Sequence, residues 1–198
     1  MENQISFWWL VLAETMAISA IGSLLHFTYG WSGKKKLVGV FSAVNESTWE
    51  HVKLALSGTF CCMLADVWFL GENPNYWIAR SVSFVVPVIV IPAIFYSYTD
   101  LTHKALLPVD ITTFVIASFI SSLVFAWMLT LRPVGELGEI ISMVISTLII
   151  VMYLLLTRFP VKMFLFRDPL TGKYGYDEPR KVRKTRKQTT KNVRKSDK

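Results

Sequence analysis

The chain has 198 residues, of which 53% are hydrophobic, 14% aromatic and only 18% charged. This composition is too apolar for an ordinary soluble domain. The net charge of +7 is uneven, because residues 180–198 hold ten Lys or Arg against one acid, which leaves −2 for the rest of the chain. Cys61 and Cys62 are adjacent inside an apolar run, which favours small buried side chains and does not indicate a disulfide framework.

Several apolar runs are long enough, at about 20 residues, to cross about 30 Å of hydrocarbon, and they predict an all-α integral membrane bundle. Five spans are expected, at about residues 5–29, 49–70, 77–98, 109–131 and 140–157. A short amphipathic segment at 160–167 would lie in the interface and complete a transmembrane domain of residues 1–167. Residues 168–198 are expected to form a tail that begins with a turn at Asp168–Gly172 and is basic and disordered from residue 180.

The positions of Lys and Arg predict the orientation of the bundle. Lys34, Lys35 and Lys36 follow the first span and the basic tail follows the fifth, so an even number of spans separates them. Both lie on one side, which the positive-inside rule makes cytoplasmic, with the N-terminus outside. The first span lacks a basic start and a small-residue cleavage site, so we expect it to be retained.

The third predicted span contains Pro87 and Pro92, which remove backbone donors and are expected to kink it. Such a kink serves either as a transporter hinge or as a static bend in a bundle. No internal repeat is visible, so the sequence lends no support to an inverted-repeat transporter.

Three ionisable residues are predicted at a similar depth in the outer third of the bilayer: Glu14, Asp66 and Arg80. Charged groups are costly in hydrocarbon, so we expect these three to pair or to face a wet cavity. One interpretation is an ion pair between Arg80 and a carboxylate that fixes helix packing. The alternative is a proton or cation step along a transport pathway.

The predicted inner face is richer in ionisable groups. All three histidines fall there together with four acids: His26, Glu46, Glu50, His51, Asp100, His103 and Asp110. The topology depends only on apolar runs and basic residues, so this clustering is an independent indication of function.

Asn45–His51 brings two carboxylates and an imidazole together at the start of the second span. Part of this stretch has a structural explanation, because Ser47 and Glu50 match a capping box in which Glu50 reaches back to the Ser47 N–H. Lys53 lies on the helical stripe of the two glutamates and can neutralise them. Trp49 suits an aromatic belt at the interface.

Imidazole nitrogens and carboxylate oxygens are also the ligand set of zinc, manganese and iron. The sequence therefore predicts a divalent-metal site with these ligands: His26, Glu46, Glu50 and Asp110. Catalytic roles would fall to Glu50 and His51, with His51 as a further ligand or as the proton-transfer group. A metal so held would activate water against an ester or amide of a lipid headgroup. Glu50 and His51 are about 100° apart on one helix, so this stretch cannot close a site alone.

Two other patterns carry less weight. Asn45-Glu46-Ser47 is formally a glycosylation sequon, which cytoplasmic placement would make silent. The basic tail has no aromatic residue after Tyr176 and directly follows membrane spans. Its predicted partners are therefore the anionic lipid headgroups of the bilayer, and no specific nucleic acid is expected.

Gly22–Phe27 (GSLLHF) followed by Phe41–His51 (FSAVNESTWEH) resembles the signature of a bacterial membrane family known only as a domain of unknown function. Asp110 within VDITTF and residues 168–175 (DPLTGKYG) are also similar to that family. The resemblance covers nearly the whole chain except the basic tail. It implies a multi-pass protein of the bacterial cytoplasmic membrane and names no substrate. The chain lacks the H-x-x-x-H pair of ceramidase-like membrane hydrolases, which counts against placing it among them.

Three functional hypotheses follow from these patterns. The leading one is an inner-face polar site around His26, Glu46, Glu50 and His51 that binds a cation and hydrolyses a lipid-like substrate. The competing one is a small transporter or channel that uses Glu14 and Asp66. The third is a non-catalytic membrane assembly or partner protein with the basic tail as its docking arm.

Overall fold

The computed structural model describes residues 2–176, and this part of the chain is all-helical without a β-strand. Its elements are α1 (Glu2–Trp31), α2 (Lys36–Gly39), α3 (Thr48–Leu70), α4 (Tyr76–Thr102), α5 (Leu107–Leu129), α6 (Glu136–Arg158) and the 3₁₀ turn η1 (Phe164–Phe166). Five of these helices, all except α2, are long and apolar enough to cross a membrane. The predicted all-α bundle of five spans is therefore confirmed. The predicted basic, disordered segment at 180–198 lies outside the described residues.

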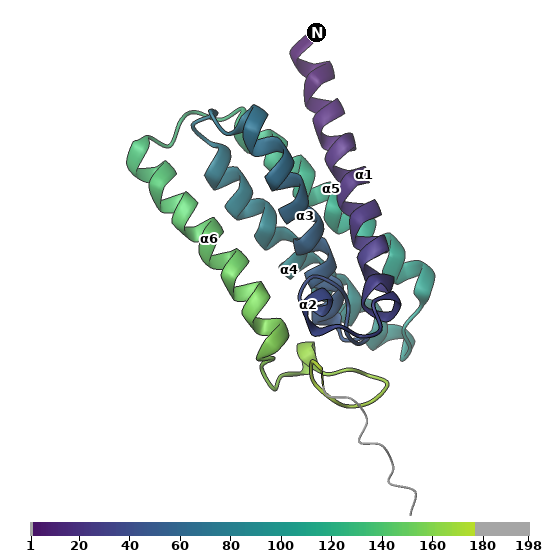
Figure 1. The fold of residues 1–198 in the computed structure, drawn as a ribbon. Helices are drawn as coiled ribbons and strands as arrows, with labels where there is room; N and C mark the ends of the chain where they lie inside the picture. Colours follow the sequence, from purple (N-terminus) through teal and green to yellow (C-terminus); the bar gives the residue numbers. More distant parts are fainter. Residues whose placement is uncertain (1, 177–198) are drawn as a thin grey trace, which may run out of the picture.

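The five long helices form one bundle with two distinct ends (Figure 1). We call the end where α1 begins the N-terminal end, and the end that carries α2 and η1 the C-terminal end. Helix α3 packs against α1 and α4, α5 packs against α1 and α4, and α6 packs mainly against α4. Large apolar side chains remain exposed on the outer faces, such as Trp68 at 84% and Phe69 at 85%, as lipid contact requires.

Small residues bring the helices close together, as in other membrane bundles. A Cβ built on Gly58 of α3 would lie 2.9 Å from the Ile18 carbonyl oxygen of α1. Between α4 and α6, the Ser81 hydroxyl lies 2.8 Å from that of Ser146 and 2.9 Å from the Ser142 carbonyl oxygen. These contacts satisfy polar groups inside the bundle, where no water is at hand.

A buried charge cluster joins three helices in the N-terminal half. Arg80 of α4 is fully buried, and its Nη2 donates to Glu14 of α1 and to Asp66 of α3. Its guanidinium carbon also lies 3.5 Å from the ring centroid of Phe125, and the Tyr76 hydroxyl donates to Asp66 at 2.6 Å. The ion pair expected between Arg80 and a carboxylate is thus present, and both acids take part in it.

Helix α4 runs without interruption through Pro87 and Pro92. It ends at His103, whose φ of 55° closes the helix in the left-handed conformation. Cys61 and Cys62 are both free thiols; Cys62 is buried as expected, whereas Cys61 is exposed, so the expectation of a buried side chain is wrong for Cys61.

The chain after α6 folds back across the C-terminal end of the bundle. We call residues 159–176 the C-terminal loop. It turns at Asp168, whose carboxylate accepts bonds from the Leu170 N–H at 2.9 Å and the Thr171 hydroxyl at 2.6 Å. The turn predicted at Asp168–Gly172 is therefore confirmed, and an antiparallel bridge between Arg167 and Tyr174 closes it.

Two hydrogen bonds tie the C-terminal loop to the connection between α1 and α3. The Asn45 side-chain amide donates to the Gly175 carbonyl at 3.0 Å, and the Tyr176 hydroxyl donates to the Lys36 carbonyl at 2.7 Å. These bonds place the first residues of the predicted tail, 168–176, against the helical domain.

Candidate metal centre

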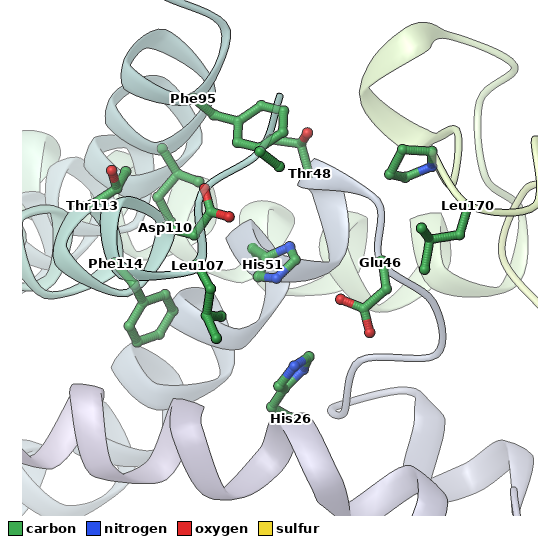
Figure 2. A pocket seen from close by; sticks show the side chains of 13 residues that line it. His26, Glu46, Thr48, His51, Phe95, Leu107, Asp110, Thr113, Phe114 and Leu170 are labelled. Carbon is green, nitrogen blue, oxygen red and sulfur yellow. The ribbon is translucent and has the colours of Figure 1, made fainter. Parts of the chain in front are cut away.

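A cavity of about 340 Å³ lies at the C-terminal end, between α1, α3, α4, α5 and the C-terminal loop. Figure 2 shows the side chains that line it. One part of the lining is polar and consists of His26, Glu46, Thr48, His51, Asp110 and Thr113. The other part is apolar and consists of Ile91, Phe95, Ala105, Leu107, Phe114, Pro169 and Leu170. The cavity is therefore amphipathic, lined by six polar and seven apolar side chains, and we call the polar set its polar wall.

Three potential metal ligands converge on the polar wall. His26, Glu46 and His51 each offer one ligand atom, and these atoms all lie within 4.8 Å of one another. The side chains of the three residues point toward a common space (Figure 2), with the two imidazole centroids 5.7 Å apart. A tetrahedral ion with ligands at about 2.1 Å holds its ligand atoms roughly 3.4 Å apart, so side-chain shifts of roughly 1 Å bring the trio onto one ion.

Each histidine is presented in a form that suits a ligand. Nδ1 of His51 lies 3.1 Å from the Ser47 carbonyl oxygen, one helical turn away. A carbonyl only accepts, so Nδ1 carries the proton and Nε2 keeps its lone pair, the arrangement seen in metal-bound histidines. Nδ1 of His26 is buried and has no hydrogen-bond partner among residues 2–176. A buried ring nitrogen without a partner is costly unless a ligand fills the gap.

Glu46 is positioned by a local turn. The Asn45 side-chain oxygen accepts the Ser47 N–H at 2.9 Å, which is an Asx turn across Glu46. The Asn45 amide is at the same time anchored on Gly175. The backbone of Glu46 is therefore held between α3 and the C-terminal loop, while its side chain is exposed toward the cavity.

Glu50 does not line this cavity. Its carboxylate is 2% exposed, pairs with Lys53 at 2.6 Å and accepts the Val44 N–H at 2.8 Å. The predicted capping box is wrong, because Ser47 makes no side-chain cap and its N–H bonds to Asn45. The expected neutralisation of Glu50 by Lys53 is confirmed. Since Lys53 also donates to the Gly39 carbonyl at 2.9 Å, the pair fixes the loop that leads to Glu46.

Asp110 lines the cavity on α5 but stays outside the trio of ligand atoms. Its Oδ1 accepts the Tyr98 hydroxyl at 2.5 Å, and Tyr98 in turn accepts the Leu106 N–H at 3.1 Å. One carboxylate oxygen is thereby oriented, and the other remains for a proton or a substrate group.

The remaining predicted residues lie elsewhere. His103 and Asp100 line a separate, open hollow at the end of α4. Trp49 was expected in an interfacial aromatic belt, and this expectation is wrong. It is only 6% exposed, and its ring packs against that of Phe166 in η1, with the ring centroids 4.7 Å apart and the planes tilted by 30°.

The sequence did not point to several residues of this region: Phe95, Phe114, Pro169 and Leu170 line the cavity, and Tyr98 bonds to Asp110 beside it. Tyr98 and Phe95 carry no local signal, because aromatic residues are common in any membrane span. Leu170 enters the cavity only because the C-terminal loop folds back. The family-like motif DPLTGKYG was the one pattern in the sequence that pointed to this segment.

The model of a family of unknown function (DUF6512) matches residues 2–176. The match covers most of the chain, which therefore belongs to that family, so the resemblance to a family of unknown function is confirmed. No curated protein and no solved structure matches the chain.

Proposed function

We propose that this chain, as a member of the DUF6512 family, is a metal-dependent membrane hydrolase that binds a divalent ion of the zinc class through His26, Glu46 and His51. The observation that carries the proposal is the convergence of these three ligand atoms within 4.8 Å at the wall of an amphipathic cavity. Two histidines and one glutamate with an open fourth position are the ligand set of several catalytic zinc sites. Structural zinc sites are instead closed by four protein ligands.

The cavity also suits hydrolysis of a lipid-like ester. Its apolar side, which includes Phe95, Phe114 and Leu107, would receive an acyl chain, and its polar wall would receive the ester group. Leu107, which lines the cavity at the start of α5, is 71% exposed, so this part of the lining reaches the surface of the bundle. Ligand sites of this kind combine apolar walls with a few placed polar groups.

The proposed reaction consumes one water. Asp110, held by Tyr98, would accept a proton from the attacking water as its oxygen adds to the ester carbonyl carbon, and a divalent ion held by His26, Glu46 and His51 would supply activation of that water. The same ion would supply positive charge next to the ester carbonyl oxygen, where negative charge develops. The C–O bond to the alcohol then breaks, Asp110 returns its proton to the leaving oxygen, and an acid and an alcohol are released. Glu50 acts from a distance in this scheme by fixing the loop before Glu46.

We further propose that the site faces the cytoplasm in a bacterial cytoplasmic membrane, with the N-terminus outside. Lys34 and Lys35 lie between α1 and α2, and Lys36 is the first residue of α2, at the same end of the bundle as the cavity. The positive-inside rule assigns such a cluster to the cytoplasmic side. The competing transporter hypothesis loses support because both of its acids, Glu14 and Asp66, are paired with Arg80.

Metal analysis of the full chain, purified in mild detergent after incubation with zinc and removal of excess ion, tests the proposal. We expect about one ion per chain, lost in His26→Ala, Glu46→Gln and His51→Ala. His103→Ala is the matched control, since it removes the histidine outside the cavity, and it should keep the ion. A wild-type protein without bound ion, or ligand variants that retain it, would refute the site.

The hydrolytic part needs its own measurement. Asp110→Asn should keep the zinc content and lose at least about 10²-fold in the hydrolysis rate of a fluorogenic phospholipid ester, the usual contribution of a general base. If wild type and Asp110→Asn released the fluorophore at equal rates, Asp110 would not be the base. If zinc-loaded wild type released none above a protein-free control, the centre would bind metal without this chemistry.

A further inference from the structure

The buried cluster of Arg80, Glu14 and Asp66 holds more acids than bases. Among residues 2–176, Arg80 is its one cation, and Glu14 and Asp66 are the ion-pair partners of that cation. When both carboxyl groups are ionised, one negative charge in the cluster therefore stays uncompensated. Glu14 is 6% exposed and Arg80 is fully buried. A net charge in such surroundings is costly because no water solvates it.

The guanidinium of Arg80 reaches both acids through a single nitrogen. Its Nη2 contacts Oε1 of Glu14 at 2.5 Å and also contacts Oδ2 of Asp66. Nε and Nη1 have no hydrogen-bond partner among the described residues, and the guanidinium carbon lies 3.5 Å from the ring centroid of Phe125. Two carboxyl groups that crowd one nitrogen bring like charges together, and in such pairs one of the two groups keeps its proton.

Oε2 of Glu14 is the carboxyl oxygen of this cluster that has no hydrogen-bond donor within residues 2–176. Both oxygens of Asp66 are engaged, Oδ1 by the Tyr76 hydroxyl at 2.6 Å and Oδ2 by Arg80. Oε1 of Glu14 is engaged by Arg80 as well. An ionised oxygen that is buried without a donor costs more free energy than a neutral hydroxyl in the same place. A proton on Oε2 of Glu14 therefore removes the largest penalty.

A proton suits this position better than a metal cation does. Oxygen-binding cations need many ligands: Ca²⁺ takes six to eight oxygens, and Mg²⁺ requires an octahedral shell. Within the described part of the chain, the cluster offers one carboxyl oxygen without a partner, Oε2 of Glu14. A proton needs only that oxygen and leaves the hydrogen bonds of Asp66 in place.

The titratable groups next to the cluster do not supply the missing positive charge. Cys62 of α3 is close enough to interact electrostatically with Glu14 and Arg80, but a thiol adds no positive charge. Tyr76 of α4 is a neutral donor to Asp66. The excess of one acid over one base therefore stands.

Helices α5 and α6 meet this part of the bundle with uncharged side chains. Helix α5 contributes the ring of Phe125, and its ionisable residue, Asp110, lies at the cavity of the C-terminal end. Helix α6 contacts α4 beside the cluster through the hydroxyl of Ser146, which bonds to that of Ser81. A proton is thus the group that would balance the charge.

We propose that Glu14, Asp66 and Arg80 form a proton-binding site, in which one proton rests on Oε2 of Glu14. Asp66 and Arg80 are then a one-to-one ion pair, and the contact between α1, α3 and α4 is electrically neutral. The two acids behave as one unit, because removing either of them leaves one carboxylate opposite Arg80 and no reason to hold the proton. This site lies in the N-terminal half of the bundle and does not depend on the proposed metal centre.

Infrared spectroscopy of the full chain, purified at neutral pH in a detergent without carbonyl groups, tests this. A protonated carboxyl group has a C=O stretching band apart from the amide and carboxylate bands, and preparation in D₂O shifts it. We expect this band in wild type. Glu14→Gln and Asp66→Asn should each abolish it, because one acid then faces one arginine. Glu72→Gln removes an exposed glutamate after α3; it is the matched control and should keep the band.

Wild type alone can refute the site, so the test does not depend on the folding of a variant. Wild type without the band would exclude a bound proton. Carboxyl-¹³C labelling of glutamate should shift the wild-type band, and a shift on labelling of aspartate instead would overturn the assignment to Glu14.

The variants test the sharing of charge, once circular dichroism has shown that they keep their helices. A band that persists in Asp66→Asn but not in Glu14→Gln would mean that burial alone keeps Glu14 neutral, and would overturn the shared site. A band that persists in both would place the proton elsewhere. A band that sodium chloride removes from wild type, but choline chloride does not, would identify a sodium site instead.

Discussion

The buried Lys53–Glu50 pair offers a sharp test of what holds the candidate centre together. Lys53→Met keeps the length of the side chain and removes its charge. Glu50 then stays buried at 2% exposure without its partner at 2.6 Å, and the Gly39 carbonyl loses its bond at 2.9 Å. Breaking one side of a buried ion pair costs about 3–5 kcal/mol, and an orphaned carbonyl adds about 1 kcal/mol. We expect a total loss of about 4–6 kcal/mol in the free energy of unfolding.

The double variant Lys53→Met/Glu50→Gln separates the charge effect from packing. Without either charge, the glutamine can still accept the Val44 N–H, so we expect stability within about 2 kcal/mol of wild type. Equilibrium unfolding in mixed SDS micelles, followed by circular dichroism, measures all three proteins. Lys104→Met, at an exposed position, is the control and should change little. If the free energy of unfolding of Lys53→Met lay within about 1 kcal/mol of that of wild type, the Lys53–Glu50 pair would not hold the loop that leads to Glu46.

Three further predictions use the same unfolding assay. Gly58→Ala should lower the free energy of unfolding by about 1–3 kcal/mol, because its Cβ would meet the backbone of α1. Gly30→Ala is the control and should not destabilise the protein, because nothing lies within 4 Å of the added Cβ. Equal effects of the two substitutions would contradict the close approach of α1 and α3 at Gly58. Arg80→Met should lose about 3–5 kcal/mol because it leaves two carboxylates without their shared partner, and a neutral result would mean that the cluster contributes nothing to packing. The bond from Tyr176 to Lys36 needs the protonated phenol, and burial raises this pKa from 10 to about 12. Its contribution should be complete below pH 10 and vanish as the pH rises through about 12, so the stability difference between wild type and Tyr176→Phe should disappear in that window.

Two features were predictable from the sequence: the bundle of five long helices, and the grouping of His26, Glu46 and His51 at one end of it. Span lengths follow from apolar runs, and basic residues assign His26, Glu46 and His51 to one end of the bundle. The position of each residue along its predicted span placed Arg80 at the same depth in the bilayer as Glu14 and Asp66. These inferences need only helix geometry and solvation.

Helix geometry and solvation could not predict which of the acids Glu46, Glu50 and Asp110 would meet the two histidines in the cavity. Glu46 and Glu50 are equivalent by helical spacing, yet Glu50 turns to Lys53 while Glu46 faces the cavity. The choice depends on the Asx turn at Asn45, which takes the Ser47 N–H that a capping box would use. Asp110 was expected as a ligand, but its bond to Tyr98 orients it within the cavity and apart from the trio. The Asx turn is local, but Asn45 is also held by its bond to Gly175, a contact 130 residues away in the chain that local patterns do not contain.

The fold-back of the C-terminal loop has a consequence for how the protein is made. Its bonds to Asn45 and Lys36 join residues 130 and 140 positions apart in the chain. During synthesis, the first four spans would enter the membrane long before residues 168–176 leave the ribosome. Until then, one wall of the cavity and the support of Asn45 are missing. The cavity is therefore completed last, after every span has been synthesised.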